Sequence, residues 1–410
     1  MIKKLFFTFI LFFSFTIFPQ ADWTIFVYIE AAEALQHEGI FNITQMAFAN
    51  VPEHINVIAQ LHTKGDKSWL YKVEKNNIIA LDYVQMAPDA KDNIITSVEK
   101  IHEEFPAKHF CLILWNHGFG ILEPTYDEDS NEWVVEPDGN EYGACEVKRY
   151  KPGYFKGMMV DPHHKTVMNN KDMIETARVI SEDILGKKIE VLAMDCCMGA
   201  MLEHGYQLRD YADYMVGSQD CELTDGYDYQ NFIKDFHNGY LSPLQVAQSI
   251  VDHYGEYNKI HAPIGTYTMS AIDLSYMEKI KVNLDALTNN LLKLLNSKQD
   301  LFKEVIYRAR KGCPKFCMAA YYADLYLFYQ YLYNEIDQYE NLLLAQEVKK
   351  IITRGKELIK ESVVANVAGD VNEGVQGISI YFPFFHIDTS YPRTIFAQET
   401  LWLTFLKTLV

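Results

Sequence analysis

Basic side chains are scarce in this chain relative to acidic ones. Its 410 residues carry 37 Lys and Arg against 55 Asp and Glu, which gives a formal net charge of −18. Nucleic-acid binding depends on concentrated Lys and Arg. The composition therefore argues against nucleic acid as a partner, and it accommodates a cationic substrate more easily.

Internal repeats, low-complexity linkers and long apolar runs are missing after the amino terminus. No segment beyond residue 21 approaches the roughly 20 consecutive apolar residues that a bilayer span requires. The hydrophobic content of 49% is nevertheless enough to build a large core. We therefore expect one α/β domain with a helical addition rather than two separable domains.

The first residues are the exception to this shortage of apolar runs. "MIKKLFFTFILFFSFTIFPQADW" places Lys3 and Lys4 before an apolar run at 5–18, followed by small or polar residues at 19–21. This order predicts a secretory signal peptide over 1–21, with an uncleaved signal anchor as the alternative. We expect the protein to be secreted, periplasmic or on the cell surface.

Cysteine is also infrequent, and its seven copies are an odd number. Pairing within one chain cannot be complete, so at least one thiol stays free or pairs outside the chain. Cys313 and Cys317 lie four apart in a helical pattern and fit equally well as small buried hydrophobes. Cys196 and Cys197 stand side by side directly behind Asp195, which makes this segment the most informative one.

Apolar runs of strand length alternate with helical periodicity through the first half of the chain. Strands of this composition, separated by helices, predict a mostly parallel sheet covered on both faces. The predicted strands are 23–30, 55–62, 109–116, 189–195 and 214–218, and the predicted helices are 31–49, 91–104, 170–185 and 198–209.

The second half of the chain follows a different pattern. From 228 to 368 it is mainly helical and rich in Tyr, before a final strand at 377–383 and a closing helix from about 396. The sequence thus predicts an α/β core over 22–227 and a helical region over 228–410 that returns its last strand to the core. The polar stretch 121–157 is too long for an ordinary connection, so we expect it to be functional or flexible.

Two predicted strands end in reactive side chains. His117 follows "LILWN", and Cys196 and Cys197 follow "EVLAMD". The carboxyl ends of parallel strands meet at one sheet edge, so a Cys nucleophile and its His base would meet there. The helical pattern from Met198 onward would add a helix N-terminus to stabilise a thiolate. The Gly118 N–H would face a developing oxyanion.

Each of these residues also has an ordinary structural interpretation. A single His at a strand end is commonly a satisfied structural residue, and a Cys there is commonly part of the core. Asp195 would serve equally well as the N-cap of the following helix.

Four segments, in order, resemble the clostripain-like cysteine peptidases, family C11 of the caspase-like clan: "LWNHGFG", "MDCCMGAMLE", "GSQDCELTDGYDY" and "GISIYFP". The resemblance runs from Trp23 to the end and implies a caspase-like three-layer core with a mostly parallel sheet. The family pattern of Asp, any residue, Cys, and Glu six positions later falls on Asp195, Cys197 and Glu203. It implies that Cys197 is the nucleophile and His117 the catalytic histidine.

The resemblance also implies a specificity. Asp195, with Ser218, would line the pocket for the residue before the scissile bond. A carboxylate there prefers Arg or Lys through charge-assisted hydrogen bonds. The partners implied are protein or peptide substrates with Arg or Lys at that position, cleaved by a monomeric enzyme.

Members of the family are often activated by their own cleavage between the His and the Cys. Four basic residues of this chain fall in the 121–157 stretch. A basic-specific enzyme would cut there, although a surface charge cluster without consequence is the equal alternative. The processing candidates are Lys148, Arg149, Lys151 and Lys156.

No cofactor is required by the chemistry, and no metal is assigned. Calcium is implied by the family resemblance alone, with the acidic stretch 127–132 as a possible source of oxygens. The chain departs from the family at "YIEAAEAL" (28–35), where members commonly read "YMxGDNNL". The overall prediction is a secreted cysteine endopeptidase acting through a thioester. The alternatives are a catalytically silent caspase-like binding protein and a clan member with non-basic specificity.

Overall fold

The computed structural model describes residues 20–32, 35–87, 89–123, 125–127, 132–134, 159, 167–262, 265–314, 316, 321–339 and 341–410. The predicted signal peptide lies outside these residues except for its last two positions. Most of the 121–157 stretch, including all four processing candidates, also lies outside them.

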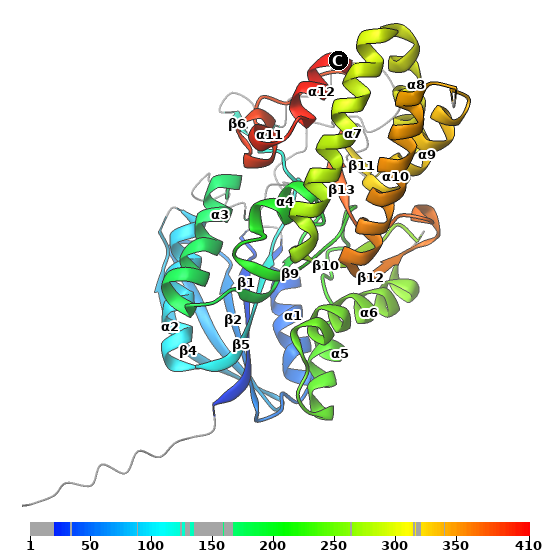
Figure 1. Ribbon diagram of the computed structural model, residues 1–410. Coiled ribbons are helices and arrows are strands. Elements are labelled where there is room, and N and C mark those ends of the chain that lie inside the picture. The colour runs from blue at the N-terminus through cyan, green and yellow to red at the C-terminus, as the bar shows by residue number, and fades with distance from the viewer. Residues whose placement is uncertain are drawn as a thin grey trace, which may run out of the picture.

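A nine-stranded sheet forms the centre of the molecule (Figure 1). Its central five strands are parallel, and they are the five strands predicted from their continuous apolar runs. Antiparallel strands extend the sheet at both edges. In spatial order the strands are β12 (Val363–Ala368), β10 (Thr268–Asp273), β9 (Ala212–Gly217), β8 (Ile189–Asp195), β5 (Ala107–Trp115), β1 (Ala21–Glu30), β2 (Ile55–His62), β3 (Lys67–Glu74) and β4 (Asn77–Gln85).

Helices cover both faces of this sheet, as Figure 1 shows. Alternate side chains of β1 point to opposite sides: Ile25 and Val27 join one core cluster, and Phe26 and Tyr28 join the other. The first face is covered by α1 (Gln36–Phe48), α5 (Tyr229–Lys234) and α6 (Pro243–His261). The second face is covered by α2 (Ala90–Glu104), α3 (Asn170–Arg178) with the π-helical turn Val179–Leu185, and α4 (Leu202–Leu208). The expected three-layer α/β architecture is confirmed.

A helical region follows the core, as predicted, and packs against the second face. It contains α7 (Met277–Ser297), α8 (Gln299–Gly312), α9 (Leu325–Asp337), α10 (Leu343–Ser362), α11 (Ile395–Glu399) and α12 (Trp402–Leu409). Short 3₁₀ turns lie at Asp235–Asn238, Leu274–Tyr276, Asp370–Asn372 and Tyr391–Arg393. Two strands in this region, β10 and β12, were not predicted, and they extend the core sheet.

The last predicted strand does not enter the central sheet. It forms β13 (Ser379–Tyr381), which pairs antiparallel with β11 (Tyr322–Asp324) in a separate two-stranded sheet. A single parallel bridge from Met201 to Ser379 joins it to the core. A further short hairpin consists of β6 (Thr125–Asp127) and β7 (Glu132–Val134).

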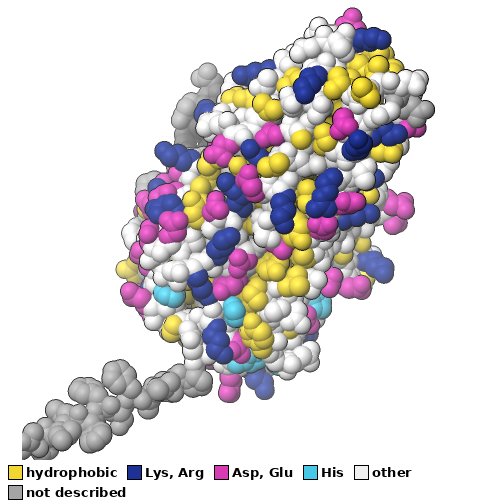
Figure 2. Space-filling view, in the orientation of Figure 1, with side chains coloured by type: hydrophobic (Ala, Val, Ile, Leu, Met, Phe, Trp, Pro, Cys, Tyr) yellow, Lys and Arg dark blue, Asp and Glu magenta, His cyan; other side chains and the backbone are white. Residues whose placement is uncertain are grey.

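The surface in Figure 2 mixes acidic and basic side chains over the face it shows. Such interspersed charge differs from the concentrated basic surface of a nucleic-acid binder. Within the described part of the chain, no helix is both long and apolar enough to cross a membrane.

Candidate active site

The carboxyl ends of β5 and β8 bring the predicted catalytic segments together. The two strands are parallel neighbours, with Trp115 opposite Asp195. His117 and Cys197 each lie two residues beyond this pair. The two loops also touch, because a Cβ atom on Gly118 would collide with the Cys197 carbonyl oxygen and lie 2.8 Å from Cys196 Sγ. Only glycine at 118 allows this approach.

Cys197 lies in a turn rather than at the start of a helix. Met198 adopts a left-handed conformation with φ of 57°, and its N–H donates to the Asp220 carbonyl oxygen at 3.1 Å. The helix α4 begins only at Leu202, after Met201. The predicted start of the helix at Met198 is therefore wrong. The expected stabilisation of a Cys197 thiolate by a helix N-terminus is wrong for the same reason.

The Cys197 side chain is 8% exposed. Its Sγ accepts a hydrogen bond from the Glu222 N–H at 3.3 Å. A donor at this distance favours the thiolate over the thiol. The segment after β9 thus supplies the contact that sequence reasoning had assigned to α4.

The neighbouring thiol is unsuited to nucleophilic attack. Cys196 is 3% exposed, and burial, reinforced by the charge of Glu222, raises its pKa well above the usual range. A thiol that stays protonated is a poor nucleophile. Cys313 lies just after α8 rather than in a helix, and it is buried and free, as expected of a small hydrophobe. Cys317 lies outside the described residues. Cys221 is disulfide-bonded, whereas Cys111 is a free buried thiol.

Asp195 is the last residue of β8, and its carboxylate is 3% exposed. Its Oδ2 accepts hydrogen bonds from the Tyr229 hydroxyl at 2.6 Å and the Tyr227 N–H at 3.2 Å. Burial raises the pKa of Asp195 to about 6, and these hydrogen bonds limit the rise. Because α4 begins seven residues later, the N-cap interpretation of Asp195 is wrong.

Gly226 covers the Asp195 carboxylate. Its φ is +65°, and a Cβ atom there would lie 2.8 Å from Asp195 Oδ2. A larger residue would be strained and would crowd the carboxylate.

Ser218 is fully buried at the end of β9. Its hydroxyl pairs with Thr268 Oγ1 at 2.8 Å and with the Asp220 carbonyl oxygen at 3.0 Å. Both contacts shape the segment that leads to Glu222. Direct contact of Ser218 with substrate stays a prediction.

A buried polar network, not foreseen from the sequence, holds the segment after β9 against the helical region. Gln219 donates to Asp324 Oδ2 at 2.9 Å and accepts from the Gly377 N–H at 2.9 Å. Asn372 donates to Asp220 Oδ2 at 3.1 Å. The helical region therefore braces the segment that contacts Cys197.

Glu203 is fully buried between α4 and the carboxyl-terminal segments. Its Oε1 accepts from the Tyr381 N–H at 2.9 Å and the Tyr391 hydroxyl at 3.2 Å, while Oε2 has no partner in the part of the chain that the structure describes. Burial raises the pKa of Glu203 to about 7. The glutamate of the family pattern thus has a structural position in this chain.

His204 links the loop after β5 to the loop after β8, and sequence reasoning missed it. Its Nδ1 donates to the Gly199 carbonyl oxygen at 3.0 Å, and it also bonds the backbone of Gly120. Burial lowers the pKa of His204 to about 4, so the ring is neutral near pH 7.

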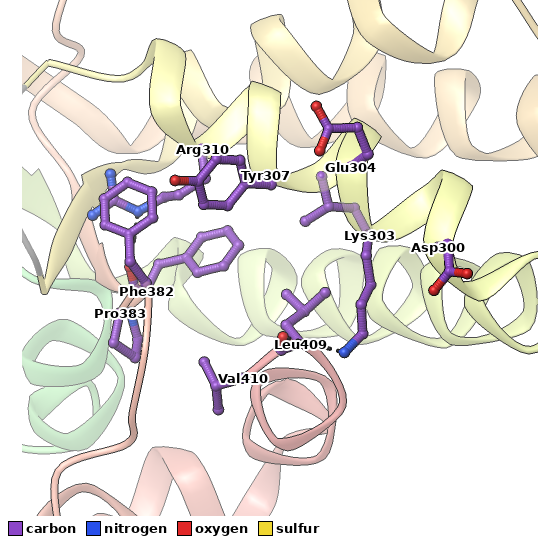
Figure 3. A pocket seen from close by; sticks show the side chains of 11 residues that line it. Asp300, Lys303, Glu304, Tyr307, Arg310, Phe382, Pro383, Leu409 and Val410 are labelled. Carbon is purple, nitrogen blue, oxygen red and sulfur yellow. Dashed lines mark hydrogen bonds between the residues drawn. The ribbon is translucent and has the colours of Figure 1, made fainter. Parts of the chain in front are cut away.

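Within the described residues, no group of three His, Cys, Asp or Glu side chains could hold a metal ion. A cavity of about 390 Å³ lies in the helical region, between α8, the segment after β13 and the end of α12 (Figure 3). It is lined by Phe382, Tyr307 and Arg310 among others and contains no Cys or His. The predicted catalytic residues lie instead at the β5–β8 edge.

Comparison with known proteins connects this edge to a family. A model of the clostripain family, peptidase family C11, matches residues 126–407. The match includes Asp195, Cys197 and Glu203 and begins after His117. No curated protein sequence matches the chain significantly.

Solved structures share the fold at low sequence identity. A secreted C11 cysteine protease from Bacteroides thetaiotaomicron, in complex with an irreversible peptide inhibitor, is 17% identical, with a TM-score of 0.63 over 94% of this chain and 99% of that one. An inactive zymogen C11 protease from Parabacteroides distasonis is 15% identical, with a TM-score of 0.59 over 95% and 99%.

These structures establish the common fold, with its mostly parallel sheet and carboxyl-terminal helical region. The family model covers well over half of the chain and includes the cysteine turn. The chain belongs to the clostripain family of cysteine endopeptidases.

Proposed function

We propose that this chain is a secreted cysteine endopeptidase that cleaves after Arg or Lys, with Cys197 as nucleophile and His117 as general acid and base. The observation that carries the proposal is the buried Asp195 carboxylate, two residues before Cys197 on the strand that ends at the site. An anionic group in a water-poor pocket recognises a cationic side chain through charge-assisted hydrogen bonds.

The reaction follows from these roles. The Cys197 thiolate attacks the scissile carbonyl carbon, and the Gly118 N–H faces the oxyanion. His117 gives a proton to the leaving amine as the carbon–nitrogen bond breaks, which leaves a thioester on Cys197. Water then attacks the thioester while His117 accepts its proton. The carbon–sulfur bond breaks and releases the acid product and the Cys197 thiolate.

The experiment maps cleavage sites in a denatured protein mixture by mass spectrometry of new termini. We expect cuts after Arg and Lys with the wild-type protein under reducing conditions, and none with Cys197→Ala. Cys197-dependent cuts after other residues would overturn the specificity. No Cys197-dependent cuts after activation would favour a catalytically silent binding protein.

Self-activation belongs to the same proposal. The candidates Lys148, Arg149, Lys151 and Lys156 lie between His117 and Cys197 in the sequence. The similarity to a protein solved as an inactive zymogen supports a processed form. Amino-terminal sequencing of the purified wild type should find a cut after one of them that is absent from Cys197→Ala. Full activity of an uncut chain would contradict self-activation.

No metal takes part in the proposed chemistry, because the nucleophile, base and specificity group are all side chains. We expect a calcium chelator to leave kcat/KM unchanged in the processed protein. A loss of activity that added Ca²⁺ restores would show a calcium dependence.

For its location and assembly, we propose that the processed protein is secreted and monomeric. Size-exclusion chromatography with light scattering of the culture medium fraction tests both points.

A further inference from the structure

A second carboxyl group lies buried beside Asp195. Both carboxyl oxygens of Glu222 are shielded from solvent, and no side-chain donor among the described residues hydrogen-bonds to them. The Cys196 backbone N–H lies close to the same carboxyl group and favours its ionised form, against the larger effect of burial. Asp195 is the strongest charged influence on Glu222, and the two carboxyl groups are within hydrogen-bonding reach if Glu222 carries a proton. Two carboxylates in one buried site do not ionise together at low cost, so the pair shares a proton.

The groups around this pair suit a cation. The hydroxyl groups of Tyr227 and Tyr254 are buried and have no partner among the described residues, so their oxygens are available to accept hydrogen bonds. The Tyr229 hydroxyl already donates to Asp195. The other titratable groups that influence the pair and these phenols are acids or thiols. They are Cys196 and Cys197 after β8, Cys111 of β5 and Asp220 after β9.

Glu222 also contacts the nucleophile. Its N–H donates to Cys197 Sγ at 3.3 Å, and the ionised forms of Glu222 and Cys197 oppose each other. A second negative charge at Glu222 would therefore make the Cys197 thiolate harder to form. A proton on the Asp195–Glu222 pair avoids this cost while the pocket is empty.

We propose that Asp195 and Glu222 form a two-carboxyl specificity pocket, which holds one shared proton when empty and exchanges that proton for the cationic side chain of the substrate. This inference rests on the proposed preference for Arg or Lys. On binding, the proton leaves the pair for solvent, and the substrate guanidinium or ammonium group keeps its own protons. The empty pocket carries one negative charge, and the filled pocket carries two carboxylates and one cation. The net charge beside Cys197 is thus the same in both states.

The test measures proton release when a peptide ending in agmatine binds the processed wild-type protein. This peptide carries the guanidinium group and lacks a scissile bond. Isothermal titration calorimetry at pH 7, in two buffers of different ionisation enthalpy, counts the protons. We expect close to one proton released per peptide, since the pair loses its shared proton. With Glu222→Gln we expect no release and an affinity roughly tenfold weaker or more.

The controls separate this inference from the proposed function. Glu53→Gln removes one negative charge at an exposed position, so its peptide affinity and proton release should match those of the wild type. Labelling of Cys197 with iodoacetamide should confirm that each variant keeps an intact site. Wild type that binds the peptide and cleaves after Arg without releasing a proton would overturn the inference alone. Equal affinity and proton release in Glu222→Gln would do so as well. Wild type that neither binds the peptide nor cleaves after Arg or Lys would overturn both.

Discussion

Trp115 of β5 and Asp195 of β8 are direct neighbours in the parallel register of the central sheet. This pairing sets His117 and Cys197 at the same step beyond the sheet edge. The contact of Gly118 with the Cys197 carbonyl oxygen then fixes the two loops against each other. His117 and Cys197 are 80 positions apart in the sequence, so strand pairing rather than a local motif brings their loops together.

Replacement of the two adjacent cysteines should give opposite results. Cys197→Ala should lower kcat/KM by about 10³-fold or more, because it removes the nucleophile. Cys196→Ala should stay within a few-fold of wild type, because the buried Cys196 thiol remains protonated. Steady-state kinetics on one Arg-containing peptide tests both variants. A large loss in Cys196→Ala with an unchanged circular dichroism spectrum would reassign the nucleophile.

Asp195→Asn should affect specificity more than stability. The amide oxygen can still accept from Tyr229 and Tyr227, while the negative charge is lost. We expect kcat/KM for an Arg peptide to fall by about 10²-fold, the value of one or two charge-assisted hydrogen bonds. The matched peptide with citrulline, which is neutral and similar in shape, should lose much less. Equal losses on both peptides, with a lower Tm, would assign Asp195 a structural role instead.

The central part of the fold could be predicted from the sequence because β1, β2, β5, β8 and β9 are buried on both faces. Such strands read as unbroken apolar runs. The edge strand β4 was missed because nearly all of its side chains meet solvent, with Ile78, Ile79 and Tyr83 among the exposed ones, so it has no continuous apolar run. The start of α4 was missed because apolar spacing does not reveal the left-handed Met198.

The residues of the candidate site also divide into those that the sequence could predict and those that it could not. His117, Asp195 and Cys197 could be placed at one sheet edge because each lies at or just after the end of a recognisable strand. Gln219 and Glu222 could not, because their roles depend on tertiary contacts. The Gln219–Asp324 hydrogen bond spans 105 positions. The contact from Glu222 to Cys197 uses a backbone N–H, which leaves no mark on residue type.

Glu203 makes the stability of this protein depend on pH. The pKa of Glu203 is about 7 in the folded chain and 4.5 in the unfolded chain. Between pH 4.5 and pH 7, the folded chain therefore binds a proton at Glu203 that the unfolded chain does not. Its contribution is fully present below pH 4.5 and is lost as pH rises through 7. The difference corresponds to on the order of 3 kcal/mol. Glu203→Gln should therefore raise Tm at pH 8 and change it little at pH 5.

Calorimetry of both proteins at the two pH values tests this. Burial raises the pKa values of Asp195 and Asp324 to about 6, so their contributions to stability also fall as the pH rises, whereas the contribution of His204 changes in the opposite direction. These contributions are common to both proteins, so the difference in Tm between variant and wild type isolates Glu203. Exposed Glu53→Gln serves as the charge control and should show no pH-dependent difference. A Glu203→Gln difference in Tm that is the same at pH 5 and pH 8 would refute the assignment.

Gln219 should couple the helical region to catalysis. Gln219→Ala leaves the buried Gly377 N–H without its partner, which costs about 1–3 kcal/mol. It also removes one of two donors to Asp324 Oδ2, which keeps the Gln376 N–H at 2.8 Å. The segment carrying Glu222 then loses its brace, and the Glu222 N–H moves away from Cys197 Sγ. We expect kcat to fall about tenfold with KM changed less, because the contact acts on the nucleophile. Asn372→Ala, which releases Asp220 on the same segment, is the matched comparison and should act in the same direction. A lower Tm with kcat unchanged in both variants would mean that the network stabilises the fold without positioning the nucleophile.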